Sequence, residues 1–301
     1  MREFRCNRHH KDGTPIIKDV EIADYAEELV ADYNPVYLEE PWNLDALRFA
    51  EYYLGATVDF VDIYCEEGEQ IAGAAVFNTE RIKLFDRENM CTRVETFEEN
   101  TILIDNSTMQ TGKETFARFT VLHEAGHICM HPSVYRLPEG QISMFDLMPS
   151  EGRSVVCCRN TSIDRRQKKL VTQEDFREHQ ANTFAAAVAM PRRIFSEIAK
   201  EAIRKMGCEE DYYKLPTLWE TDYDPCADSL AEYMGKVFRV SKSAARVQLR
   251  KLKLIKTDFE AFTERQQLKI QQGLHRKNQE DVRSYPEVRF PVTIEEELPF
   301  A

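Results

Sequence analysis

Residues 113–131 read KETFARFTVLHEAGHICMH, and this stretch decides how the rest of the sequence is interpreted. Its apolar and small residues recur every three or four positions, which is the period of a helix. The residues on this stripe are Phe116, Phe119, His123, Gly126, His127 and Met130. The stretch therefore predicts one helix whose buried face includes two histidines.

The two histidines have the spacing of a metal site. His123 and His127 are four residues apart, so their Cβ atoms lie about 5–6 Å apart on one helix face. Two imidazoles at that separation can share one zinc ion. Glu124 is turned about 100° away from His123, which keeps it off the metal and places it to act as a general base on water. The alternative is that both histidines are core residues with satisfied hydrogen bonds.

A second predicted helix, residues 173–190, offers a third ligand. The residues on one of its stripes are Glu178, Ala181, Asn182 and Ala185. The two alanines are small enough for this helix to pack close to the first one, so that Glu178 can reach the metal. Asn182 lies one turn further on and can hydrogen-bond a metal ligand from behind. The alternative for Glu178 is a solvated charge.

Three further residues are candidates for stabilising an oxyanion, and the sequence does little to separate them. They are His131, Tyr135 and His179. His131 lies about 12 Å along the helix axis from His123, so one zinc ion is not expected to bind all three histidines of the stretch. His179 points about 100° away from Glu178, which favours a structural role for it.

Composition limits the class of protein. The chain has 301 residues, of which 43% are hydrophobic and 31% are charged, as in a globular protein. Its 40 basic and 52 acidic side chains give a formal charge of -12, which argues against non-specific nucleic-acid binding by the whole molecule. No apolar run approaches the roughly 20 residues of a membrane helix. The polar N-terminus has no signal-peptide core, so we expect a cytoplasmic protein.

The remaining pattern predicts an α+β chain. Further helices are expected at 22–33, 44–54, about 192–206, 228–238 and 241–255, and strands at 57–61, 71–77, 81–85 and 101–104. Asn43 is the expected cap of the helix 44–54. The strands 71–77 and 81–85 are expected to form a hairpin across Asn78-Thr79.

Three segments are expected to lie outside these elements. Residues 1–15 are polar and are predicted to be a flexible start. Residues 132–170 show no clean period and are a candidate lid or partner surface, because long structureless segments in compact domains are often functional. Residues 263–301 are polar and look like a peripheral tail.

The segment 235–257 is basic and carries no acidic side chain. Ser241 is a plausible N-cap for a helix whose basic residues include Lys242, Arg246 and Arg250. One interpretation is contact with DNA through this helix. The favoured one, given the acidic chain, is a packing module with a solvated basic face. A third is that the basic face binds an acidic repressor or the acidic remainder of the molecule.

Together these residues resemble the ImmA/IrrE family of zinc metallopeptidases. The resemblance rests on Phe119–His127 followed by His131, and on Glu178-x-x-Ala181-Asn182-x-Phe184-Ala185-Ala186 closing with Met190-Pro191. It covers roughly residues 20–255. It implies a zincin-like metallopeptidase domain (16–215) with an active-site helix, a second ligand helix and a small, mainly antiparallel sheet. A helix-turn-helix-like module (216–262) would follow.

The resemblance also implies a function. His123, His127 and Glu178 would bind one zinc ion, with manganese as the other candidate metal, and Glu124 would be the catalytic acid/base. The substrate would be a helix-turn-helix transcriptional repressor, whose loss relieves repression of stress or mobile-element genes. The strand 101–104 could pair with an extended substrate segment. The competing hypothesis is a regulator that keeps the metal fold but sequesters a repressor, or binds DNA, without proteolysis.

Overall fold

The computed structural model describes residues 3–66, 69–136, 155–159, 170–207 and 224–276. The chain is mixed α+β, as predicted. Its main α-helices are α1 (Asp19–Tyr33), α3 (Glu114–Met130), α6 (Gln173–Ala189), α7 (Arg192–Lys205), α8 (Pro225–Phe238), α9 (Lys242–Lys251) and α10 (Asp258–Arg276). Short helical turns are η1 (Pro35–Leu38), η2 (Pro41–Asn43), α2 (Ala46–Arg48), η3 (Phe49–Tyr53), η4 (Asn106–Met109) and α4 (Pro132–Tyr135).

Within the described residues, one sheet has four strands in the order β1-β5-β2-β6. The strands are β1 (Thr57–Val61), β5 (Thr101–Asp105), β2 (Ile71–Val76) and β6 (Val155–Arg159). β1 and β5 are parallel, whereas β2 is antiparallel to both of its neighbours. A separate antiparallel hairpin joins β3 (Glu80–Asp86) to β4 (Cys91–Phe97). Most of the strand pairings are thus antiparallel, as predicted.

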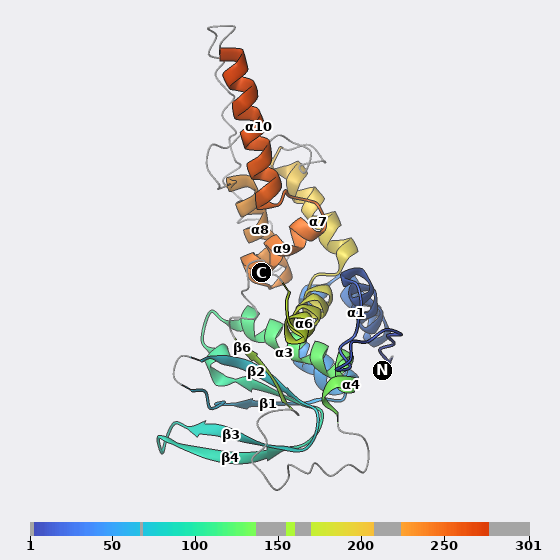
Figure 1. Cartoon of the computed structure of the whole chain (residues 1–301), viewed down its shortest axis with the longest axis vertical. Helices are drawn as coiled ribbons and strands as arrows, with labels where there is room; N and C mark the ends of the chain where they lie inside the picture. Colours follow the sequence, from blue (N-terminus) through green and yellow to red (C-terminus); the bar gives the residue numbers. More distant parts are fainter. Residues whose placement is uncertain (1–2, 67–68, 137–154, 160–169, 208–223, 277–301) are drawn as a thin grey trace.

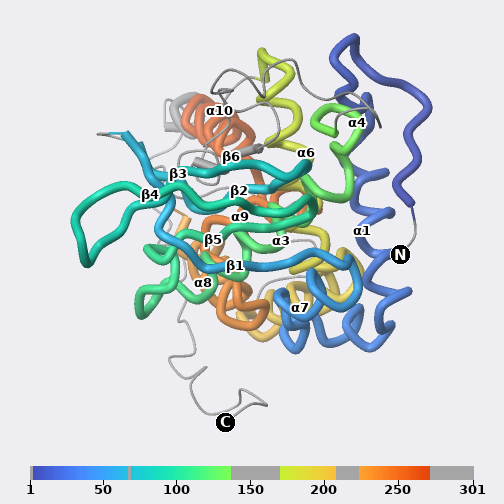
Figure 2. Tube along the Cα trace, turned by 90° about the horizontal axis from the view of Figure 1, so that it is seen from below, coloured from blue at the N-terminus to red at the C-terminus, as the bar shows by residue number. Residues whose placement is uncertain are grey.

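The sheet is covered on both faces, which explains its apolar central strand. Ile102 and Ile104 of β5 belong to the large core beneath the helices, while Leu103 belongs to a smaller core shared with the β3–β4 hairpin. In Figure 1 the hairpin lies on the side of the sheet away from α3. Helix α6 lies on the side of α3 that is away from the sheet. Figure 2 shows α1 beside these layers.

The predicted helices 22–33, 113–131 and 173–190 correspond to α1, α3 and α6, within three residues at each end. Thr172 caps α6 in a capping box with Asp175. The predicted helix 44–54 forms with a different start, because the Asp45 side chain, and not Asn43, accepts the hydrogen bonds that cap it. Gly55 follows with φ +69°, a conformation that glycine adopts without strain.

Two strand predictions were wrong. The strands 71–77 and 81–85 do not form a hairpin, because β5 and β6 occupy both edges of β2, and β3 pairs instead with β4, which was not predicted. The strand 101–104 is not available to a substrate, because β5 lies between β1 and β2. The side chain of Asn78, which was expected in the turn, donates to the carbonyl of Tyr135 at 2.8 Å.

The segments expected to be irregular also carry structure. Residues 8–16 fold back on themselves through an isolated bridge between His9 and Pro15. The segment 132–170 contributes α4 and the edge strand β6, and its residues 137–154 and 160–169 lie outside the described residues. α10 runs across the boundary predicted at residue 262, while the tail from 277 onward lies outside the described residues.

Candidate metal centre

Two neighbouring helices bring three ligand side chains together inside the molecule. His123 and His127 on α3 are fully buried, with their Nε2 atoms 3.1 Å apart. Glu178 on α6 lies opposite them, with Oε2 3.5 Å from His123 Nε2 and Oε1 3.3 Å from His127 Nε2. One ligand atom from each of the three residues lies within 4.8 Å of the others. This group could hold a metal ion.

Small residues at the crossing of α3 and α6 make this convergence possible. A Cβ atom on Gly126 would lie 3.1 Å from Phe184 Cδ1 and 3.3 Å from Ala181 Cα. Ala181 and Ala185 are themselves fully buried. The side of α6 that the sequence marked with alanines therefore faces α3, and Glu178 is not the solvated charge of the alternative interpretation.

The outward-facing ring nitrogens of both histidines are already occupied. His123 Nδ1 lies 3.1 Å from Asn182 Oδ1, and His127 Nδ1 lies 3.0 Å from His131 Nδ1. The amide oxygen of Asn182 can only accept, so His123 carries its proton on Nδ1 and leaves a lone pair on Nε2. Asn182 thus occupies the position behind a ligand that the sequence predicted for it.

The chemistry of this group fits a cation. Lone pairs on imidazole nitrogen and carboxylate oxygen repel one another across a dry space unless a positive charge lies between them. Within the described residues, Glu178 Oε2 is buried without a hydrogen-bond partner, and so are both carboxylate oxygens of Glu124. Two neutral imidazoles and one carboxylate are ligands that suit zinc.

Glu124 points from α3 toward strand β2. It is fully buried, and burial together with the charge of Glu178 raises its pKa well above that of an ordinary glutamate. A Cβ atom on Gly73 of β2 would lie 3.1 Å from Glu124 Oε1 and 2.8 Å from Thr120 Cγ2. The missing side chain at Gly73 therefore makes room for the carboxylate, and sequence reasoning missed this residue. A glycine inside an apolar strand pattern was the signal for it.

His131 and His179 are not oxyanion donors in this structure, contrary to their candidacy. Both ring nitrogens of His131 are engaged, Nδ1 with His127 and Nε2 with Gln180 Oε1 at 2.9 Å, and the ring is fully buried. His179 turns away from the ligands and contacts Asp19 Oδ1 on α1 at 2.7 Å through its Nε2. Its placement agrees with the structural role that its direction favoured.

Tyr135 on α4 remains the candidate from this trio. Its ring stacks on Phe77 and lies under the guanidinium of Arg177, which is 5.3 Å from the ring centroid. Burial raises the pKa of its phenol to about 12, against the opposing charge of Arg177. The hydroxyl therefore keeps its proton at neutral pH and can donate a hydrogen bond.

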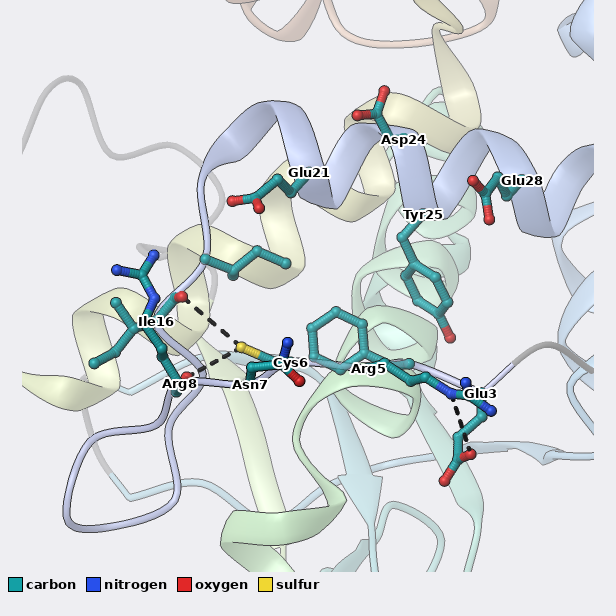
Figure 3. Close-up of a pocket in the computed structure, with 12 residues that line it drawn as sticks. Glu3, Arg5, Cys6, Asn7, Arg8, Ile16, Glu21, Asp24, Tyr25 and Glu28 are labelled. Atoms are coloured by element: carbon teal, nitrogen blue, oxygen red, sulfur yellow. Dashed lines mark hydrogen bonds and ion pairs between the residues drawn. The ribbon is translucent and has the colours of Figure 1, made fainter.

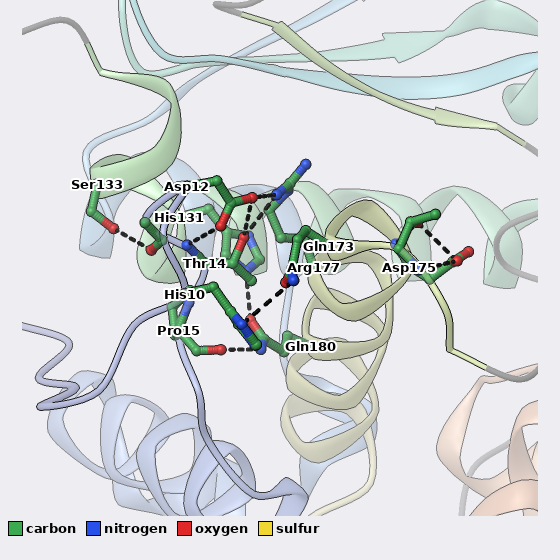
Figure 4. A network of polar contacts seen from close by, with 12 residues as sticks. His10, Asp12, Thr14, Pro15, His131, Ser133, Gln173, Asp175, Arg177 and Gln180 are labelled. Carbon is green, nitrogen blue, oxygen red and sulfur yellow. Dashed lines mark hydrogen bonds and ion pairs between the residues drawn. The ribbon is translucent and has the colours of Figure 1, made fainter.

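The N-terminal segment packs beside the ligand helix, as Figure 4 shows. Asp12 Oδ2 and Thr14 Oγ1 each lie 2.8 Å from Arg177 Nη1. The Gly13 carbonyl accepts from the hydroxyl of Ser133 at 3.2 Å. Sequence reasoning missed these contacts because they join residues more than a hundred positions apart.

A cavity of about 460 Å³ lies elsewhere, between the N-terminal segment and α1 (Figure 3). It is lined by residues 3–8, Ile16, Ile17, Glu21, Asp24, Tyr25 and Glu28, and it shares no residue with the histidine–glutamate group.

The basic residues of α9 are engaged within the chain. Lys242 and Arg246 form ion pairs with Asp228, and Arg250 forms one with Asp258. These ion pairs engage the basic side chains that would otherwise contact DNA phosphates, which favours the packing interpretation of the module.

Among the described residues, no helix is both long enough and apolar enough to span a membrane. No protein-family model matches the chain, and no curated protein shows significant similarity to it.

Proposed function

We propose that this protein is a zinc-dependent endopeptidase of the ImmA/IrrE type, with a zincin-like arrangement of α3 and α6. One observation carries the proposal: a buried group of two histidines and a glutamate lies beside Glu124, whose carboxylate has no hydrogen-bond partner among the residues that the structure describes. His123, His127 and Glu178 would be the ligands. A zinc ion held there would polarise a peptide carbonyl and make water more acidic.

The residues of the chain divide the remaining work. Glu124 would accept a proton from the attacking water on a carboxylate oxygen and deliver it to the leaving amide nitrogen. Its burial beside Glu178 raises its pKa, which suits a group that must take up and then release a proton. The hydroxyl of Tyr135 would donate to the oxyanion that develops on the carbonyl.

The resemblance in sequence supports a helix-turn-helix repressor as the substrate. At the sheet, an extended segment of that substrate would have to pair with β1 or β6, because β5 is central. Relief of repression of stress or mobile-element genes would follow from its cleavage.

The test compares wild-type protein with Glu124→Gln, using a repressor encoded beside it and added zinc or manganese. Glu114→Gln is the matched control, because Glu114 is an exposed glutamate in the first turn of the same helix. We expect wild type and control to cleave at one site, and Glu124→Gln to bind metal but to cleave about 10²–10⁴-fold more slowly. Equal cleavage by all three proteins would remove Glu124 from the mechanism.

The non-proteolytic alternative predicts a different result. Wild-type protein would then bind metal and the repressor, and the repressor would stay intact with every variant. The ion pairs of Lys242, Arg246 and Arg250 do not support DNA binding as a part of this alternative.

A further inference from the structure

A line of buried polar contacts leads from a metal ligand to the N-terminal segment. His127 Nδ1 contacts His131 Nδ1 at 3.0 Å, and His131 Nε2 contacts Gln180 Oε1 at 2.9 Å. Gln180 Nε2 then donates to the carbonyl of Pro15 at 2.8 Å. Figure 4 shows the outer part of this line, from His131 through Gln180 to Pro15. The four residues His127, His131, Gln180 and Pro15 thus form one line of hydrogen bonds.

The carbonyl at its end fixes every proton along the line. A carbonyl oxygen only accepts, so the amide nitrogen of Gln180 must face Pro15 and its oxygen must face His131. His131 therefore carries its proton on Nε2 and accepts on Nδ1. His127 must then donate from Nδ1, which leaves the lone pair on its Nε2 pointing at Glu178 and His123.

The opposite arrangement would disable the metal site. A flipped Gln180 amide would present its NH₂ group to His131 and place the proton of His131 on Nδ1. His127 would then have to accept on Nδ1 and carry its own proton on Nε2, where it blocks coordination. The flip would also set the amide oxygen of Gln180 against the carbonyl of Pro15, and a buried clash of two acceptors is costly.

The carbonyl of Pro15 is held in place by the fold of the N-terminal segment. Thr14 is fully buried, and its carbonyl accepts from the amide of His10 at 2.8 Å. The amide of Ile16 donates to the carbonyl of Arg8 at 2.8 Å. Asp12 and Thr14 are bound to Arg177, which lies one turn before Ala181 on the same helix as Gln180. The contacts of Thr14 and Ile16, the neighbours of Pro15, thus hold the carbonyl of Pro15 where it orients Gln180.

We propose that Gln180 and the carbonyl of Pro15 are positioning groups that set the tautomer of His131 and so keep Nε2 of His127 free to bind metal. The N-terminal segment 8–16 is then a part of the metal centre. The inference rests on the proposed function only in requiring that the histidine–glutamate group binds a metal.

The test measures zinc affinity by competition with a chelator in three full-length variants. Gln180→Leu removes both contacts of the amide. Gln180→Glu keeps an acceptor for His131, and as a buried, neutral carboxyl it keeps an O–H donor for the carbonyl of Pro15. Gln173→Leu is the matched control, because Gln173 is also on α6 and its amide contacts His10 of the same segment at 3.4 Å.

We expect Gln180→Leu to bind zinc about 10–100-fold more weakly than wild type. Gln180→Glu and the control should stay within about threefold, since both keep an acceptor opposite His131. Unchanged affinity in Gln180→Leu, or an equal loss in all three variants, would overturn the proposal.

Nitrogen NMR of the histidine rings in metal-free protein gives a second readout that does not need activity. Wild type should show His131 in the single tautomer protonated on Nε2, and Gln180→Leu should show a mixture. A wild-type His131 protonated on Nδ1 would contradict the inference directly. Wild type that binds zinc with these tautomers but cleaves nothing would refute the proposed function and leave the inference standing.

Discussion

At the residue scale, the environment of Glu124 separates this site from a generic pair of helical histidines. Its carboxylate is buried, has no hydrogen-bond partner in the described part of the chain, and lies against a strand position that has no side chain. Gly73 is therefore as much a part of the site as the residues with functional groups. Leu103 O would lie 2.9 Å from a Cβ atom there, so backbone also limits the space.

Gly73→Ala should impair catalysis more than metal binding. The added methyl group would collide with Thr120 and the carbonyl of Leu103 and would push the Glu124 carboxylate aside. We expect turnover to fall by at least about tenfold, because a displacement on the order of 1 Å in a catalytic group is costly. Zinc affinity, measured by chelator competition, should change by less than about threefold. Full turnover in this variant would show that β2 does not limit the position of Glu124.

At the element scale, the site depends on how closely α6 approaches α3. The helices themselves follow from local sequence, since α1, α3 and α6 appear where the apolar period predicted them. The strands were harder, because the partner of a strand is chosen by contacts far along the chain. β2 pairs with β5 and β6, whereas a local hairpin with β3 had been expected.

Gly126→Ala tests this approach. Alanine favours a helix over glycine by about 1 kcal/mol, but here its Cβ would press on Phe184 and on the backbone of Ala181. The backbone contact can be relieved only by moving α6, which carries Glu178. We expect zinc to bind at least about tenfold more weakly, while the free energy of unfolding of metal-free protein changes by less than about 2 kcal/mol. Wild-type zinc affinity in this variant would show that α6 has room to shift without moving Glu178.

At the scale of the whole molecule, polar contacts attach the C-terminal helices to the metal-binding part. Arg118 on α3 donates to the carbonyls of Phe238 and Pro41 at 3.2 and 2.9 Å. Burial, and secondly the nearby charge of Arg239, lowers the pKa of Arg118 to about 10, so it stays charged at neutral pH. Lys251 on α9 contacts Asp19 on α1 at 2.9 Å. In Figure 1 these helices lie above α6, and α10 extends away from them.

Asp19→Asn should destabilise the protein in a pH-dependent way. The hydrogen bond from His179 and the charge of Lys251 hold the pKa of Asp19 below its usual 3.8, against the effect of burial. A carboxylate with a lowered pKa stabilises the fold above its ordinary pKa, and this contribution is lost as the pH falls below that value. Because the groups are partly exposed, we expect a loss of about 0.5–1 kcal/mol at pH 7.

The measurement is thermal unfolding between pH 7 and pH 2.5. The difference between wild type and Asp19→Asn should shrink as the pH falls below about 4. Lys251→Gln should show part of the same loss, and the double variant should lose less than the sum of the single ones. A difference that is the same at every pH would exclude the ionised carboxylate as its cause.

The sequence by itself determined the parts of this protein that depend on spacing along one helix. The separation of His123 and His127, the position of Glu124 between them, and the stripe of Glu178 with its alanines all follow from the helical period. Only the tertiary structure decided which groups surround them. Gly73, Gln180 and Pro15 come from segments far away in the chain, and no local pattern specifies which distant backbone meets a given side chain. For the same reason the sequence offered His131 as a candidate for stabilising an oxyanion, whereas packing places it behind His127 as its hydrogen-bond partner.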